Sequence, residues 1–600
     1  MWSKAKALLA IAAFALTPVD AIWPVPKKIS TGDKVLFIDQ SLDITYNGDF
    51  VCWKPPGSVF YSCNHSAQLD TETLLEKQMP YTYKFQPDAG SKFNSKQIVQ
   101  AGVSRALQAI FNDNFVPWKL RERNSDFEPD LQKKQWVKSL KIVQTEEDDK
   151  STFKPLAGEV DESYSLTLSE KGEASIKAKS STGILHGLET FLQLFFKHSS
   201  GTSWYTPHAP VTIQDAPEYP HRGILLDVAR SFFEVEHIKR TIDAMSWSKL
   251  NRLHLHITDS QSWPLEIPAL PKLAEKGAYR KGLTYSPEDL AGIYEYGLAY
   301  KDLIVAYNEK PYQWWCKEPP CGAFRMNSTD VYDFLDTLFE DLFPRISPYS
   351  AYFHAGGDEL NHNDSMLDPG VRSNKTEVLA PLLQKFVDYT HGKIRDAGLT
   401  PFVWEEMITE WNMTLGKDVV IQSWLGNGAV KAMAEAGHKV IDSDYNFWVS
   451  NDSVFWKTTS IVVVDNGSTL ITATLSRPTT PSTTGAVPTK SWRLIYSHDP
   501  RAGLSEEAAK LVLGGEAAVW TETIDSVNLD TIVWPRAAVM GEVLWSGRTD
   551  ASGQNRSQYD AAPRLAELRE RMVARGVSAS PIQMPFCTQG NATECAQFDG

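Results

Sequence analysis

From His221 onward the chain repeats one pattern, in which a short apolar segment is followed by a helical stretch. Strands that alternate with helices form a parallel sheet, because each helix carries the chain back to the edge where the next strand starts. The pattern predicts seven strands, at 223–227, 252–258, 351–355, 401–404, 419–424, 439–442 and 511–519. The helices between them are expected at 237–250, 287–296, 331–342, 379–397 and 429–436. This length and order predict an α/β fold of the (β/α)8 TIM-barrel type.

One strand of that barrel is missing. The helix at 287–296 should lead into the third strand, but the chain runs through Gly297 directly into Leu298-Ala-Tyr-Lys-Asp. A barrel without one strand leaves two open strand edges with unpaired backbone groups. We therefore expect a gap in the sheet between the second strand and the strand at 351–355.

Residues 22–215 form a separate α+β sandwich domain in our interpretation, and residues 216–600 form the barrel domain with a C-terminal extension. Apolar residues alternate with polar ones at 164–168 and again at 174–178, which predicts a hairpin with one buried face. A helical apolar stripe follows at 184–195, and 104–111 predicts another helix. Pro217 and Pro220 mark the boundary.

The N-terminus has the pattern of a secretory signal peptide over residues 1–21. Lys4 and Lys6 precede an apolar run at 7–16, and Val19-Asp20-Ala21 is a cleavage pattern. The run is too short to span a bilayer, so a membrane anchor is the weaker alternative. We expect a secreted protein that starts near Ile22.

The cysteines and sequons agree with an oxidising, glycosylating compartment. Six cysteines lie as three close pairs, and local pairing is the simplest of fifteen connectivities: Cys52 with Cys63, Cys316 with Cys321, and Cys587 with Cys595. Eight N-x-Ser/Thr sequons are potential glycosylation sites, at Asn64, Asn327, Asn374, Asn412, Asn451, Asn466, Asn555 and Asn591. The formal net charge of −14 argues against nucleic acid and anionic membranes as partners.

Polar and tryptophan residues gather where the predicted strands end. Catalytic residues of a (β/α)8 barrel lie at the carboxyl ends of its strands. Two adjacent carboxylates, Asp358 and Glu359, follow one strand, and their mutual repulsion favours a protonated acid. The alternative is a Gly-Gly turn with two solvated acids. The residues at these strand ends are Asp259, Asp358, Glu359, Trp404, Trp424, Trp520 and Glu522.

Other chemistries find less support in the sequence. His254 and His256 face the same side of one strand, which suits either a metal site or, more often, a hydrogen-bonded core pair. The tetrapeptide Gly-Gly-Asp-Glu also occurs in nucleotide cyclases, but Leu360 follows it here and the chain carries an export signal. Zinc-protease, nucleophile-elbow and phosphate-loop motifs are absent from the sequence, so no metal or organic cofactor is implied.

Five stretches together resemble glycoside hydrolase family 20, and most closely its fungal secreted β-N-acetylhexosaminidases. They occur in the order and spacing of the family, and the resemblance covers nearly the whole mature chain. The stretches are His221-Arg-Gly-Ile-Leu-Leu-Asp227, His254-Leu-His-Ile-Thr-Asp-Ser-Gln-Ser-Trp-Pro264, His354-Ala-Gly-Gly-Asp-Glu359, Val403-Trp-Glu-Glu406 and Gly514-Gly-Glu-Ala-Ala-Val-Trp-Thr-Glu522.

The resemblance implies hydrolysis of terminal N-acetylhexosamine residues from glycans and chitooligosaccharides. In this family the 2-acetamido group of the substrate is the nucleophile, an exception to the two-carboxylate rule. Glu359 would then be the general acid and base, and Asp358 would orient the acetamido N–H. The resemblance also implies that Trp404, Trp424 and Trp520 form the walls of an acetamido pocket. Arg222 and Glu522 would hold sugar hydroxyls, and Asp259 would be a carboxylate of the active-site network.

Each of these residues also has a structural interpretation. Arg222 and Asp259 could form an ion pair, and the tryptophans could pack the barrel. Among functions, one alternative is an inactive glycan-binding remnant, and another is a retaining glycosidase with an enzyme nucleophile. The resemblance also allows a cleaved propeptide and a homodimer.

Two segments depart from the family pattern. The strand that ends in Asp-x-Pro-Gly-His is absent between Gly297 and Leu298. After Tyr445-Asn-Phe-Trp448 the family has a tyrosine that binds the acetamido carbonyl, whereas this chain continues with Val449-Ser-Asn and a Thr/Ser/Pro-rich run at 476–488. A linker-like run inside a barrel is out of place. We interpret both segments as mis-spliced or frame-shifted, and predict that native transcripts encode the missing strand and a different segment at 449–488.

Overall fold

The computed structural model describes residues 22–51, 53, 95–148, 155–287, 289, 323–348, 350–426, 428–450, 490–590 and 595. Several predictions fall outside these residues. They concern the signal peptide, most of the helix at 287–296, the Thr/Ser/Pro-rich run at 476–488, and the cysteines Cys52, Cys63, Cys316 and Cys321.

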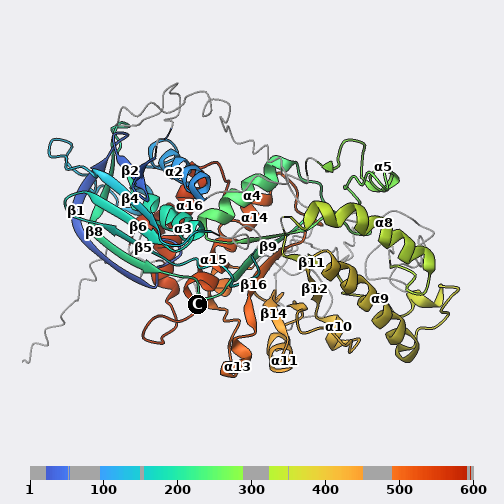
Figure 1. Ribbon diagram of the computed structural model, residues 1–600. Helices are drawn as coiled ribbons and strands as arrows, with labels where there is room; N and C mark the ends of the chain where they lie inside the picture. The colour runs from blue at the N-terminus through green and yellow to red at the C-terminus, as the bar shows by residue number, and fades with distance from the viewer. Residues whose placement is uncertain are drawn as a thin grey trace, which may run out of the picture.

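The N-terminal domain is a mixed sheet covered by helices, as predicted (Figure 1). The predicted hairpin is confirmed, since β5 and β6 pair antiparallel with Leu166 opposite Ile176. Helix α3 begins at Ser181, where the Ser180 hydroxyl accepts a hydrogen bond from the Gly183 N–H and caps the helix. Along the sheet the strands are β1 (Lys28–Ile38), β8 (Trp204–Asp215), β5 (Tyr164–Leu168), β6 (Glu173–Ala178), β4 (Ser139–Gln144), β2 (Asp43–Tyr46) and β3 (Asp49–Phe50), with β7 (Phe196–Lys197) beside β8; the helices are α2 (Ser95–Phe111), η1 (Pro117–Leu120) and α3 (Ser181–Gln193).

The second domain is built on a parallel sheet, and each of the seven predicted strands is present. Every neighbouring pair along the sheet is parallel, as the strand–helix alternation requires. The order is β10 (Arg252–His256), β9 (His221–Asp227), β16 (Val512–Val519), β14 (Lys439–Asp442), β13 (Val420–Ser423), β12 (Thr400–Trp404) and β11 (Tyr352–His354), with the short β15 (Val449–Ser450) beside β16.

The helices of this domain flank the sheet (Figure 1). The predicted helices at 237–250, 331–342, 379–397 and 429–436 are confirmed within a few residues at each end as α4, α8, α9 and α11. The helices are α4 (Val235–Trp247), α5 (Lys272–Gly277), α8 (Thr329–Ile346), η3 (Asp364–Met366), α9 (Thr376–Asp396), α10 (Glu406–Thr409), α11 (Ala429–Glu435), α12 (Trp492–Ser497), α13 (Glu506–Ala509), α14 (Leu529–Val533), α15 (Arg536–Ser546), α16 (Gln558–Ala574) and α17 (Pro585–Gln589).

Within the described residues the parallel sheet is open between β10 and β11, which are its two end strands. This is the position that the third barrel strand would occupy. Across the opening, the rings of His254 on β10 and His354 on β11 stack with their centroids 5.0 Å apart. In the described part of the chain, side chains from the two end strands therefore meet across the opening of the parallel sheet.

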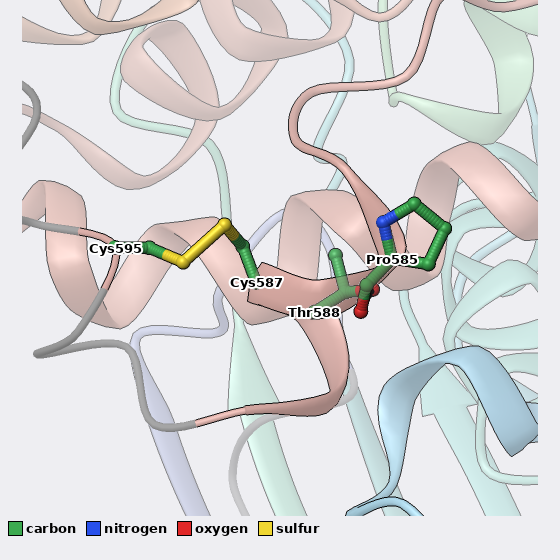
Figure 2. Close-up of a disulfide and its surroundings, with 4 residues drawn as sticks. All are labelled: Pro585, Cys587, Thr588 and Cys595. Atoms are coloured by element: carbon green, nitrogen blue, oxygen red, sulfur yellow. Dashed lines mark hydrogen bonds between the residues drawn. A yellow bond between two sulfur atoms is a disulfide. The ribbon is translucent and has the colours of Figure 1, made fainter.

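The C-terminal segment returns to the N-terminal domain. The Gln589 side-chain amide donates a hydrogen bond to the carbonyl oxygen of Trp118, which lies in η1. Cys587 and Cys595 form a disulfide, so this one of the three predicted local pairs is confirmed (Figure 2). Among the helices of the described part of the chain, none is both long and apolar enough to cross a membrane.

Candidate active site

All of the predicted site residues except Arg222 lie where the strands of the parallel sheet end. Trp404 is the last residue of β12, whereas Asp259, Trp424 and Trp520 lie just beyond β10, β13 and β16. Asp358 and Glu359 lie in the turn after β11, and Glu522 follows Trp520 on the same loop. Because the carboxyl ends of parallel strands share one edge of the sheet, these residues converge on one face.

The Gly-Gly-Asp-Glu turn has an unusual backbone. Gly356, Gly357 and Glu359 have φ angles of 73°, 106° and 53°, all in the left-handed region. A Cβ atom on Gly357 would lie 2.9 Å from the side chain of Met407 in α10, and the φ angle of 106° would strain any larger residue at this position. Glu359 adopts this conformation without being glycine, and such backbone strain costs about 1–3 kcal/mol. The turn presents the exposed Glu359 side chain next to the more buried Asp358.

The three predicted tryptophans belong to one aromatic cluster. Trp404 packs with Leu225 and Ala518, and the partly buried rings of Trp424, Tyr445 and Trp520 lie against them. The centroids of Trp404 and Trp520 are 6.2 Å apart. Partly buried indole rings at the edge of a sheet leave apolar surface for a ligand, which a fully packed core would not. Tyr445 joins the cluster from the loop that follows β14.

A charged group borders the cluster on the side of β9 and β10. The Arg230 guanidinium lies 5.1 Å from the centroid of the Trp520 ring, and its Nη2 is 3.0 Å from Asp259 Oδ2. His256 Nε2 lies 2.8 Å from the same oxygen. Burial alone would raise the pKa of Asp259, but the hydrogen bond from His256 and the positive charges hold it well below its usual range. Asp259 is therefore a carboxylate that orients Arg230 and His256.

Asp358 lies near a second buried carboxyl group. Burial raises the pKa of Asp358, and the charge of Asp259 raises it further, while His256 opposes both. Burial and the negative charge of Asp358 together raise the pKa of Glu406 to about 8. The Trp424 indole N–H lies 3.0 and 3.2 Å from the two carboxyl oxygens of Glu406. The acidic turn and the aromatic cluster are thus linked through Glu406.

The structure corrects the expectation for Arg222. This residue is the second of β9, so it lies at the amino end of the strand, away from the other site residues. Its side chain is fully buried, and its Nη2 and Nη1 donate to Glu162 of the N-terminal domain over 2.6 and 3.0 Å. An arginine buried against another domain cannot hold a sugar at the opposite end of the sheet. The alternative of an ion pair with Asp259 is also wrong, because Asp259 pairs with Arg230.

The histidines of β10 are hydrogen-bonded rather than gathered around one centre. His254 Nδ1 lies 2.8 Å from Glu516 Oε1, whereas His256 lies against Asp259. Glu516 also lies 3.1 Å from His221 Nε2, which places it between two histidines. Among the residues that the structure describes, no group of three His, Cys, Asp or Glu side chains is arranged to hold a metal ion.

Comparison with known proteins decides the family. The model of the glycosyl hydrolase family 20 catalytic domain matches residues 219–305 and 297–548, and a "beta-acetyl hexosaminidase like" model matches residues 22–194. A beta-hexosaminidase of Arthroderma benhamiae is 35% identical over 605 residues, with 95% of this chain and 96% of the relative covered. The chain belongs to glycosyl hydrolase family 20. It is therefore a glycoside hydrolase.

The chain is also similar to a second curated relative and, in fold, to a solved structure. A chitooligosaccharidolytic beta-N-acetylglucosaminidase of Ostrinia furnacalis is 31% identical over 473 residues and covers 72% of this chain and 74% of its own. The solved structure of the Flavobacterium johnsoniae chitobiase superposes with a TM-score of 0.64 at 21% identity, covering 97% of this chain and 77% of that chain. The match to the family 20 catalytic model divides near residue 300, where we predict that the third strand is missing.

Sequence reasoning missed Arg230, Glu406 and Tyr445. Arg230 lies three residues beyond the end of β9, so the rule that selected Asp259 also selects it, and rejects Arg222. Glu406 stood within the quoted stretch Val403–Glu406, but nothing local distinguishes it from Glu405. The position of Tyr445 in the sequence does not indicate that it belongs to the site, since only the packing of the loop after β14 brings it to the tryptophans.

Proposed function

We propose that this family 20 hydrolase is an exo-acting β-N-acetylhexosaminidase, which removes terminal non-reducing N-acetylhexosamine residues from glycans and chitooligosaccharides by substrate-assisted catalysis. The observation that supports it most directly is the juxtaposition of the Asp358–Glu359 turn with the cluster of Trp404, Trp424 and Trp520. The cluster offers apolar walls for an acetamido group, and the adjacent carboxyl groups supply the acid and the orienting acceptor.

In the first step the acetamido carbonyl oxygen of the substrate attacks C1 while the glycosidic bond breaks. Glu359 gives its proton to the departing oxygen, and the positive charge of the oxazolinium ring faces Asp358, which accepts a hydrogen bond from the acetamido N–H. In the second step water attacks C1, the ring opens, and Glu359 takes a proton from the water. An internal nucleophile lowers the barrier because its position is fixed in advance, which is worth about 7–11 kcal/mol in well-oriented systems.

Asp358, Glu359, Arg230 and Glu522 each have a part in this scheme. Asp358 acts as a carboxylate that accepts the N–H and faces the positive charge, although burial raises its pKa, whereas Glu359 starts protonated. Arg230, held by Asp259 and placed over the Trp520 ring, offers donors for sugar hydroxyls. Glu522 offers an acceptor on the loop that follows Trp520.

The decisive experiment varies the nucleophile, which the substrate carries. We expect hydrolysis of 4-nitrophenyl N-acetyl-β-D-glucosaminide, and a progressive fall in kcat as fluorine atoms replace the hydrogens of the acetamido methyl group. The matched control is the 4-nitrophenyl β-D-glucoside, which lacks the acetamido group and should not react. Cleavage of that glucoside, or a kcat that does not change with fluorination, would mean that an enzyme carboxylate is the nucleophile.

We also propose that the native transcript encodes an eighth strand between β10 and β11 and a different segment at 449–488, which together close the (β/α)8 barrel. Two observations support this proposal: β10 and β11 are the end strands of the described sheet, and the match to the family catalytic model divides near residue 300. The test is to sequence the transcript across codons 290–300 and 440–492. A transcript identical to this chain would refute the proposal.

For the location of the protein we propose export, with the signal peptide removed before Ile22. The sequence pattern at residues 1–21 supports this, as does the disulfide between Cys587 and Cys595. Edman or mass-spectrometric analysis of protein collected from the culture medium should give an N-terminus near Ile22. An intact Met1 on the extracellular protein would contradict cleavage.

A further inference from the structure

Glu406 is a buried carboxyl group at the active site that the catalytic scheme leaves without a task. It is the first residue of α10, directly after the turn that ends β12, and only 4% of it is exposed. Its two carboxyl oxygens lie 3.0 and 3.2 Å from the indole Nε1 of Trp424. A buried carboxyl group is costly to retain, so its position against this indole needs a reason.

The neighbouring Glu405 excludes the simplest reason, which is support of the loop backbone. Glu405 is fully buried and accepts hydrogen bonds from the backbone N–H groups of Trp424 and Leu425, at 2.8 and 2.5 Å, and from the Ser423 hydroxyl at 3.0 Å. The backbone after β13 is therefore anchored without Glu406. What Glu406 adds is a contact to the ring of Trp424.

The charges around Glu406 are of one sign. Asp358, from the turn after β11, and the adjacent Glu405 both oppose its ionisation. Around Asp358, the charges of His256 and Arg230 are offset in part by Asp259. Burial and these carboxylates raise the pKa of Glu406 to about 8, so at neutral and acidic pH it is an uncharged acid. An uncharged carboxyl group accepts from the indole N–H through one oxygen and has a proton to donate through the other.

We propose that Glu406 is a positioning residue, which holds the Trp424 indole as a wall of the acetamido pocket and keeps an uncharged surface beside Asp358. This inference rests on the proposed function, because it takes the aromatic cluster as the acetamido pocket. It assigns to Glu406 no contact with the reacting atoms. Its effect reaches the substrate through Trp424 and through the charge that Asp358 experiences.

The charge of Glu406 depends on pH. As pH rises through about 8, Glu406 ionises and two like charges face each other beside the pocket. Repulsion between the two carboxylates then weakens ligand binding beside Asp358, although the indole N–H itself favours the ionised Glu406. A neutral replacement that still accepts from the indole N–H should remove this loss. Glu406→Gln is that replacement, because its amide oxygen accepts a hydrogen bond and it does not titrate.

The test compares the full-length protein with Glu406→Gln and Glu406→Ala. The matched control is Glu410→Gln, at the other end of α10, where an exposed carboxylate lies 3.2 Å from His362. The first readout is the dissociation constant of N-acetylglucosamine-thiazoline between pH 6 and 9.5, which requires no turnover. We expect binding to the wild type and to Glu410→Gln to weaken relative to Glu406→Gln above pH 8, by roughly tenfold per pH unit at the steepest.

The second readout is kcat/KM at pH 5 for the 4-nitrophenyl N-acetylglucosaminide. We expect Glu406→Gln to stay within about threefold of wild type, and Glu406→Ala to lose roughly tenfold through the lost buried hydrogen bond. Superimposable pH profiles for wild type and Glu406→Gln would overturn the inference, as would Glu406→Ala with a lower melting temperature but unchanged kcat/KM and inhibitor binding. A wild type that neither binds the thiazoline nor hydrolyses the substrate overturns the proposed function and this inference with it.

Discussion

Replacing Arg222 tests whether this residue binds substrate or joins the two domains. Its guanidinium makes four hydrogen bonds, two to Glu162 and one each to the carbonyl oxygens of Lys249 and Tyr219, over 2.6 to 3.0 Å. It also lies 4.9 Å from the centroid of the Trp545 ring. Tyr219 and Lys249 lie just before β9 and β10, so Arg222 is held at the amino ends of the strands. We therefore expect Arg222→Met to lower stability and to leave KM unchanged.

The expected loss of stability depends on which charged group each variant leaves buried without its partner. Breaking a buried ion pair by removing one partner costs about 3–5 kcal/mol, because the other charge stays buried. Glu162→Ala, which strands the arginine, should lower the melting temperature by roughly 6–10 °C at about 2 °C per kcal/mol. Arg222→Met should cost less than this, because Glu162 keeps a contact of 3.1 Å with His186. The double variant should recover part of the loss, since it buries neither charge.

Differential scanning fluorimetry and steady-state kinetics on the same preparations provide the assay. The pKa of Glu162 is held well below its ordinary value of 4.5 by Arg222 and His186, although burial opposes them. Stability from this pair is thus present above pH 4.5 and lost as pH falls, so the difference between wild type and Arg222→Met should shrink in acid. A KM that rises tenfold or more in Arg222→Met, with an unchanged melting temperature, would refute the reasoning and restore Arg222 as a substrate ligand.

Three further predictions concern the site itself. Arg230→Lys should raise KM by roughly 10-fold, because lysine cannot keep the contact with Asp259 Oδ2 and the position over the Trp520 ring together; an unchanged KM would exclude Arg230 from sugar binding. The acid limb of the pH profile of kcat/KM should lie above pH 3.8, because burial and Asp259 raise the pKa of Asp358 and the reaction needs Asp358 ionised. Asp358→Asn should react much more slowly, and its pH profile should lack this limb. Tyr445→Phe should lower kcat by roughly 10-fold if its hydroxyl binds the acetamido carbonyl that the family's absent tyrosine would bind, and inhibitor titration checks whether the loss extends to thiazoline binding.

Much of the fold could be predicted from the sequence because it depends on local patterns. The alternation of apolar strands and helices fixes a parallel sheet, and the seven predicted strands are those observed. The direct passage through Gly297 predicted a gap, and within the described residues the sheet is open between β10 and β11, where that strand belongs. The position of Asp358 and Glu359 after a strand likewise placed them at the edge of the sheet where the candidate active site lies. Each of these inferences needs only neighbours in sequence.

Only the tertiary structure decided which of several similar residues belong to the site. Arg222 and Arg230 are eight positions apart in the sequence, but Arg222 lies near the amino end of β9 and Arg230 lies beyond its carboxyl end, so one meets the N-terminal domain and the other meets Asp259. Glu405 and Glu406 are adjacent, yet one anchors backbone amides and the other meets an indole. The side chains that decide these roles come from strands distant in sequence, and their positions are fixed only when the sheet and the two domains assemble.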